Sequence, residues 1–67
     1  MKWRASPQIL KPLHFEIEYD SVAGFYLFVY EDDICIYDDL QDTLEIAIDC
    51  ACTDFCVPKD SWKLVEE

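Results

Sequence analysis

The sequence predicts an α+β fold, a three-stranded antiparallel β-meander with one α-helix packed on one face and an extended N-terminal arm. Residues 13–20 alternate apolar and polar side chains, and residues 25–30 and 34–37 are short apolar runs separated by turn residues. Residues 44–55 instead repeat apolar side chains at helical spacing. The expected order is therefore β-β-β-α, with residues 1–12 as an extended basic arm and residues 13–67 as one small α+β domain.

The first twelve residues, MKWRASPQILKP, predict an arm because Pro7 and Pro12 interrupt a helix and no alternation is sustained. The arm contains basic residues and no acid. We expect its apolar side chains to pack on the domain or on a partner, since each contributes about 1.5–3 kcal/mol when buried. These anchors are Trp3, Ile9 and Leu10.

The run 13–20 predicts a half-buried strand, with Phe15 and Ile17 on one side and Glu16 and Glu18 on the other. Residues 20–24 link it to the next run. Gly24 can adopt a positive φ there, so the sequence predicts a hairpin.

The run 25–30 is apolar on both faces, which is typical of a strand covered twice or central in a sheet. Glu31-Asp32-Asp33 forms a turn without the glycine that a tight hairpin prefers. The strand 34–37 follows. The side expected to meet the helix carries Phe15, Ile17, Leu27 and Ile36. The open face is expected to display Glu16, Glu18, Tyr26, Phe28, Tyr30, Cys35 and Tyr37.

The helix is expected to begin at Asp42, which can cap it, with Glu45 completing a capping box. Val57-Pro58 disfavours its continuation, so it should end near Phe55 or Cys56. We expect Trp62, Leu64 and Val65 to form a closing turn or short strand. The core stripe of the helix is predicted to contain Leu44, Ala47, Ile48, Ala51 and Phe55.

The helix region, with Thr43-Leu44-Glu45-Ile46-Ala47, then Phe55-Cys56-Val57 and Trp62, resembles a loose group of short, uncharacterised bacterial proteins. In that group a strand pair precedes a T-L-E-E-A helix ending in F-G-V and a Trp. The resemblance covers residues 25–62 and implies a fold without implying an activity. Cys56 stands in place of the helix-ending glycine, and Ile46 replaces an acid on the outer face.

The formal net charge is -10, and the charges are unevenly distributed. From Glu16 to Asp54 the chain carries acids and neither lysine nor arginine. Such a segment repels nucleic acid and anionic membranes and attracts basic proteins. Solubility alone is the competing explanation.

The first twenty residues lack the apolar core of a secretory signal, and no apolar run is long enough to span a membrane. We therefore expect a cytoplasmic protein with reduced thiols. Cys52 and Cys56 are expected to be buried small side chains, and Cys50 the most reactive thiol. We expect neither a cofactor nor a metal site, and no enzymatic activity, because His14 has no partner groups that define a catalytic set.

The function that the sequence favours is that of a small acidic protein-binding module, an inhibitor or immunity-type protein that engages a basic, nucleic-acid-binding surface. A phage-coded nucleic-acid mimic is one form of this hypothesis. The alternatives are a cysteine-based metal or redox module using Cys50, Cys52 and Cys56, and a structural homodimer. The arm covering the open face would leave it without a binding role. The predicted partner-binding residues are Glu16, Glu18, Tyr26, Phe28, Tyr30, Asp38 and Asp39.

Overall fold

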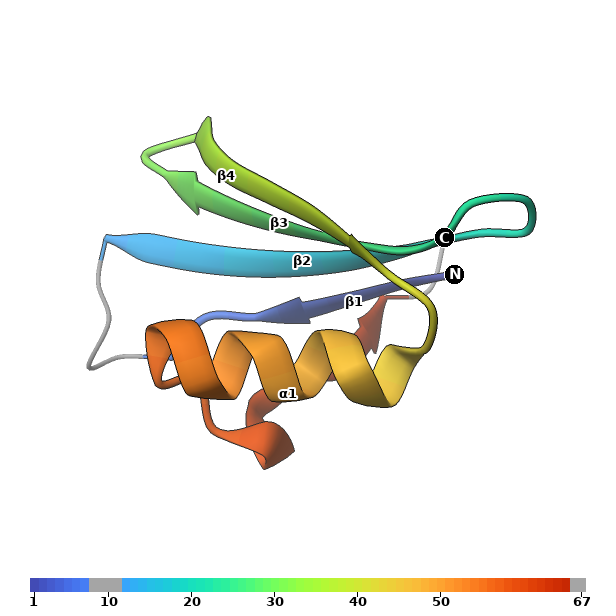
Figure 1. Cartoon of the computed structure of the whole chain (residues 1–67). Helices are drawn as coiled ribbons and strands as arrows, with labels where there is room; N and C mark the ends of the chain where they lie inside the picture. The colour runs from blue at the N-terminus through green and yellow to red at the C-terminus, as the bar shows by residue number, and fades with distance from the viewer. Residues whose placement is uncertain (8–11, 66–67) are drawn as a thin grey trace.

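The structure, a computed structural model, describes residues 1–7 and 12–65 as an open five-stranded antiparallel sheet with one α-helix along one face (Figure 1). Its elements in chain order are β1 (Lys2–Ala5), β2 (Leu13–Asp20), β3 (Gly24–Glu31), β4 (Ile34–Gln41), α1 (Leu44–Phe55), the 3₁₀ turn η2 (Lys59–Ser61) and β5 (Lys63–Val65). The strand order is β4-β3-β2-β1-β5. The α+β class and the single covering helix are confirmed.

The prediction of three strands is wrong, because both ends of the chain join the sheet. β1 pairs with β2 along Lys2–Ala5 and with β5 on its other side. Part of the predicted arm is thus an inner strand, and Trp3 packs against the core as expected. The other two predicted anchors, Ile9 and Leu10, lie outside the described residues.

The hairpin between β2 and β3 is confirmed. The carboxylate Oδ1 of Asp20 accepts hydrogen bonds from the backbone N–H groups of Val22 (2.8 Å) and Ala23 (2.9 Å). These bonds lower the pKa of Asp20. Gly24 follows with a φ of 123°, and a Cβ there would lie 2.6 Å from the carbonyl oxygen of Gln41. This position therefore requires glycine for both its dihedral angle and its close approach to β4.

The turn between β3 and β4 is a two-residue hairpin, since Glu31 pairs with Ile34. Asp32 and Asp33 both have positive φ, at 49° and 69°. This geometry matches the twist of the strands, and aspartate is among the few residues that tolerate it. The chain thus makes the tight turn without a glycine.

A β-bulge in β4 reverses two of the predicted side-chain orientations. Val29 pairs with Tyr37 and Tyr30 pairs with Cys35, so Ile36 is the extra residue between them. Tyr37 consequently shares the core face with Val29 and packs edge-on against Phe55, with ring centroids 5.3 Å apart. Ile36 is 49% exposed. The expectation that Ile36 meets the helix and Tyr37 lies on the open face is therefore wrong, because an extra residue shifts the alternation of the strand.

Helix α1 begins one residue later than predicted. Thr43, and not Asp42, is the N-cap: its hydroxyl accepts a hydrogen bond of 3.1 Å from the Ile46 N–H. The predicted end is confirmed, with Cys56 as the C-cap in the left-handed conformation and its N–H bonded to the Cys52 carbonyl. An αL residue after the last turn is the usual helix ending, although glycine is the usual residue there.

The core lies between α1 and one face of the sheet. Ala47 and Ala51 are the fully buried helix residues, which lets the helix approach the sheet closely. The partly buried Leu44, Ile48 and Phe55 complete the predicted stripe. The core consists of Ala5, Phe15, Ile17, Leu27, Val29, Ala47, Ala51 and Val57.

Candidate functional site

The sheet face opposite α1 is the candidate site, and no helix or strand of the described residues covers it. Because neighbouring residues in a strand point to opposite sides, the buried positions of each strand identify the exposed ones. Phe15, Ile17, Leu27 and Val29 are buried under the helix, so their chain neighbours face outward. We call this surface the open face; it displays Lys2, Arg4, His14, Glu16, Glu18, Tyr26, Phe28, Tyr30, Cys35, Asp38, Leu40, Lys63 and Val65.

Three aromatic side chains of β3 form a continuous strip along the middle of the open face. The rings of Tyr26 and Phe28 are nearly parallel at 5.8 Å between centroids, and those of Phe28 and Tyr30 are 6.4 Å apart. His14 on β2 stacks on Tyr30 at 4.9 Å. The three β3 rings are half-buried by one another and by neighbouring strands. The aromatic strip is therefore an ordered, partly solvated apolar surface.

Partial burial raises the pKa of Tyr30, with a smaller contribution from the negative charge of Glu16. The phenol therefore remains protonated at neutral pH and can both donate and accept hydrogen bonds. One end of the aromatic strip thus offers a polar group beside an apolar surface, a combination common at protein interfaces.

Glu16, one of the predicted partner-binding acids, is already paired within the chain. Glu16 lies between two cations of β1, with its carboxylate 3.2 Å from Arg4 Nη2 and 3.8 Å from Lys2 Nζ. Its side chain is only 13% exposed. Glu18, one pleat further along β2, is exposed. Glu16 consequently holds β1 against β2 and presents less charge to a partner than the sequence suggested.

The structure places six of the seven predicted partner-binding residues on the open face, with Asp39 as the exception. Asp39 pairs with Leu27 and so lies on the helix side of the sheet. Its carboxylate accepts hydrogen bonds from the Leu40 N–H (2.9 Å) and from Gln41 Nε2 (2.6 Å). The Asp39 carboxylate is therefore occupied by two hydrogen-bond donors of β4, while Asp38 remains exposed on the open face.

The basic side of the open face is not predicted from the sequence. Lys2 and Arg4 on β1 and Lys63 on β5 all point outward, opposite the core-facing Trp3 and Ala5. The alternation Lys-Trp-Arg-Ala was the available signal, but four residues are too few to separate a strand from an arm. The open face thus runs from acidic and apolar residues on β4, through the aromatic strip on β3, to basic residues on β1 and β5.

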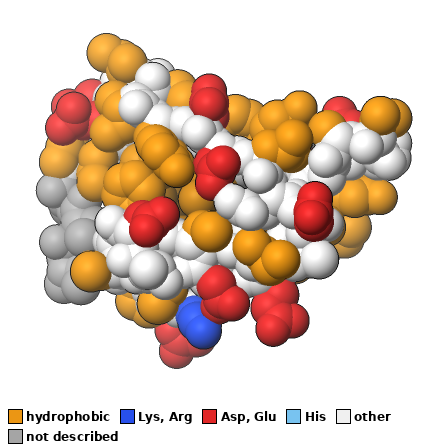
Figure 2. All heavy atoms as spheres, viewed as in Figure 1, with side chains coloured by type: hydrophobic (Ala, Val, Ile, Leu, Met, Phe, Trp, Pro, Cys, Tyr) orange, Lys and Arg blue, Asp and Glu red, His pale blue; other side chains and the backbone are white. Residues whose placement is uncertain are grey.

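The helix side of the molecule has a different character. Figure 2 shows acidic side chains spread over that visible side, with apolar groups between them and basic atoms only near its lower edge. Lys59 pairs with Asp49 at 2.8 Å, and this contact raises the pKa of Lys59. The acidic composition is therefore distributed around the fold and is not confined to one site.

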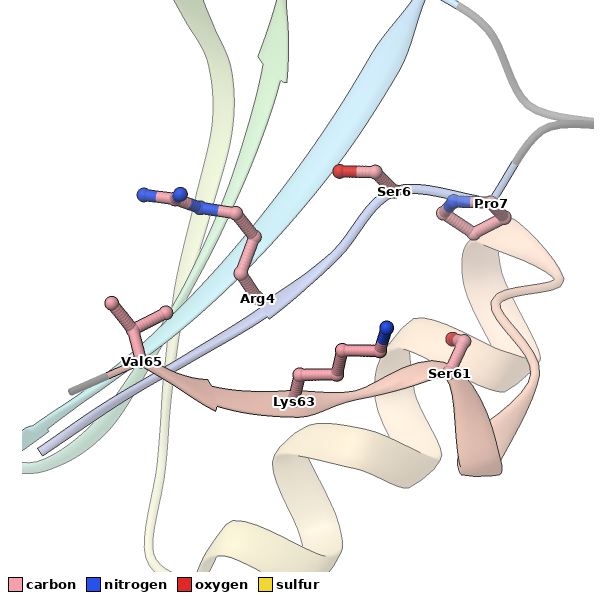
Figure 3. Close-up of a pocket in the computed structure, with 6 residues that line it drawn as sticks. All are labelled: Arg4, Ser6, Pro7, Ser61, Lys63 and Val65. Atoms are coloured by element: carbon pink, nitrogen blue, oxygen red, sulfur yellow. The ribbon is translucent and has the colours of Figure 1, made fainter.

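A hollow of about 550 Å³ lies at the edge formed by β1 and β5 (Figure 3). Figure 3 shows the Lys63 side chain reaching toward Ser61, whereas the Arg4 guanidinium turns the other way. The Ser61 hydroxyl donates to the Pro58 carbonyl at 2.6 Å. The hollow thus does not bring its two charges together, and Ser61 has no base beside it among the described residues.

The cysteines differ from their predicted environments. Cys56 is exposed and Cys52 half-buried, so the expectation of a buried pair is wrong for Cys56. Cys50 packs against the core, and its partial burial, reinforced by the nearby Asp39, raises its pKa. The higher pKa lowers its thiolate fraction, which does not favour Cys50 as the most reactive thiol. Within residues 1–7 and 12–65, no group of three His, Cys, Asp or Glu side chains is arranged to hold a metal ion.

Over the part of the chain that the structure describes, α1 is too short and too polar to cross a membrane. Comparisons of the chain with protein-family models, with curated proteins and with solved structures found no match. The resemblance of the helix region to short bacterial proteins therefore stays a prediction.

Proposed function

We propose that the protein is a small acidic protein-binding module that engages a basic protein surface through its open face. The aromatic strip is the observation that carries this proposal. Tyrosine and phenylalanine are enriched at protein interfaces, and a two-layer fold leaves this strip against solvent. Its rings already hold one another in place, so these side chains would lose little conformational freedom when a partner binds them.

The partner's chemistry follows from the order of charges across the face. Asp38 lies directly beside Phe28, and Leu40 beside Tyr26, on the outermost strand. A cation of the partner could lie over an aromatic ring while pairing with Asp38, and a cation over a ring contributes about 0.5–1 kcal/mol at an exposed site. The net charge of -10 would also accelerate the approach of a basic protein.

The finer proposal is an inhibitor or immunity-type protein that blocks a nucleic-acid-binding surface, in phage or another context. Carboxylates would then occupy the positions that phosphates take on the partner. Its support is the charge of the chain and its small size. Because Glu16 is paired within the chain, the carboxylates expected to meet the partner are Asp38 and Glu18.

An affinity experiment tests this function. The immobilised chain should retain a basic protein from an extract of its native cells at low salt and release it at high salt, because screening weakens the attraction. The double variant Tyr26→Ala with Phe28→Ala should lose that protein. The matched control Thr53→Ala, on the exposed side of α1, should retain it.

Circular dichroism would show that the variants are folded. The proposal fails if no basic protein is retained at low salt, or if the strip variant retains the same protein as the wild type.

A further inference from the structure

The residues of the open face form cross-strand rows whose chemistry changes in order from one edge of the sheet to the other. In the first row, the pairings Arg4–Lys63, Arg4–Glu16, Glu16–Phe28 and Phe28–Asp38 place five residues at one level. From β4 to β5 this row reads Asp38, Phe28, Glu16, Arg4, Lys63. An acid and a base therefore occupy its two ends, with an aromatic ring and a guanidinium next to them.

The second row lies two residues along each strand. Its pairings are Leu40–Tyr26, Tyr26–Glu18, Glu18–Lys2 and Lys2–Val65. From β4 to β5 it reads Leu40, Tyr26, Glu18, Lys2, Val65. Apolar side chains occupy both of its ends, and a ring and an ammonium group lie next to them. The bulge of β4 begins beyond Phe28, so both rows keep regular pairing.

We propose that a second copy of the chain covers the open face, related to the first by a two-fold axis that runs along β2. This inference takes the same docking surface as the proposed function, so a second copy and a basic partner would compete for the face. Such a rotation keeps each row at its own level and exchanges its two ends. β4 of one copy then lies over β5 of the other, and β3 lies over β1, in the face-to-face arrangement of two packed sheets.

In these two rows, every pair that the rotation creates away from the axis is complementary. Asp38 of one copy meets Lys63 of the other, and Phe28 meets the cationic Arg4. In the second row Leu40 meets Val65, and Tyr26 meets Lys2. The face therefore contains both the acidic, aromatic half that would attract a basic partner and a basic strip that fits it.

Like charges meet near the axis, where Glu16, Glu18 and, at the end of β2, Asp20 face their own copies. The carboxylate of Glu16 is already neutralised by Lys2 and Arg4 at 3.8 and 3.2 Å. Glu18 lies beside Lys2 across the β1–β2 pair but forms no ion pair within the described residues. Glu18 and Asp20 are thus the main local charges opposing association.

Reversing the charges at the two ends of the first row tests the inference. The measurement is the dimerisation of the purified chain by sedimentation. The wild type should dimerise. The variants Asp38→Lys and Lys63→Glu should each weaken self-association at least about 10-fold, because each brings like charges together twice. An equimolar mixture of the two variants should recover a heterodimer of near wild-type affinity, because both contacts are then between opposite charges.

The net charges of the variants show whether the dimer affinity depends on the contacts at positions 38 and 63 or on the overall repulsion between two negative chains. Asp38→Lys makes each chain less negative, so a dimer opposed only by net charge would become tighter. The mixture carries the same total charge as two wild-type chains. Both positions are exposed, so neither substitution removes a core contact.

The inference is overturned if the wild type is a monomer, if both variants dimerise as the wild type does, or if the mixture remains monomeric. Retention of a basic protein that depends on Tyr26 and Phe28 would in each case leave the proposed function standing. Loss of that retention with an intact wild-type dimer would remove the function and keep the inference.

Discussion

Cys56 ends α1 with a φ of 61°, a left-handed conformation that glycine adopts at lower cost. A non-glycine residue in this region costs roughly 1–2 kcal/mol, and the extra unfolded-state freedom of glycine offsets about half of that. Cys56→Gly should therefore raise the free energy of unfolding by about 0.5–1 kcal/mol in urea titrations.

The matched control is Cys52→Gly, in which the same substitution falls inside the helix. It should destabilise the protein, since glycine is a poor helix former and a half-buried side chain is lost. Equal effects of the two substitutions would contradict the role given to the left-handed cap.

Asp20 is a residue whose charge should affect the pH dependence of stability. Two backbone N–H groups hold its folded-state pKa below the ordinary value of 3.8. A lowered folded-state pKa stabilises the protein above the unfolded pKa, and this contribution is lost as the pH falls through the folded value.

Asp20→Asn keeps an acceptor oxygen for the turn but cannot ionise. The stability advantage of the wild type over this variant should therefore shrink between about pH 5 and about pH 2, measured by urea unfolding. A difference that stays constant over this range would show that the Asp20 charge does not contribute.

At the scale of the elements, the start of α1 depends on one hydroxyl. Thr43 Oγ1 accepts the Ile46 N–H, so Thr43→Ala should lower the free energy of unfolding by about 1 kcal/mol. Asp42→Ala should have a smaller effect, because that carboxylate acts only as a negative charge near the helix N-terminus. Thermal unfolding of both variants measures the two losses of stability. A loss for Asp42→Ala that equals or exceeds the loss for Thr43→Ala would show that Asp42 is the N-cap.

The elements also show how far the sequence predicts this fold. β2 is eight residues long and alternates throughout, so its buried Phe15 and Ile17 could be assigned from the pattern. The bulge at Ile36 could not, because the extra residue is evident only once β4 is aligned with β3. The choice of Thr43 over Asp42 likewise depends on which side chain the turn after β4 directs at the helix, since both residue types can cap.

In the whole molecule, β1 and β5 place basic residues within the sheet, and the sequence does not predict that either segment joins it. Lys2 and Arg4 were expected on a separate arm, but β1 lies inside the sheet and places them beside Glu16. A pairing between distant segments is set by tertiary packing, which a four-residue pattern cannot specify. The aromatic strip was predictable because β3 is apolar on both faces, whereas the basic half of the open face was not.

Photo-crosslinking from position 28 tests whether the open face is a docking surface. Phe28 would be replaced by a photoreactive phenylalanine analogue, with the same analogue at Val22 as the control. Val22 is 94% exposed in the β2–β3 turn, so it samples solvent without belonging to the face. We predict that position 28 forms an adduct with a second copy in the purified protein, or with a basic protein in an extract of its native cells, and that position 22 forms neither. Absence of both adducts at position 28, or identical adducts from the two positions, would contradict that role of the open face.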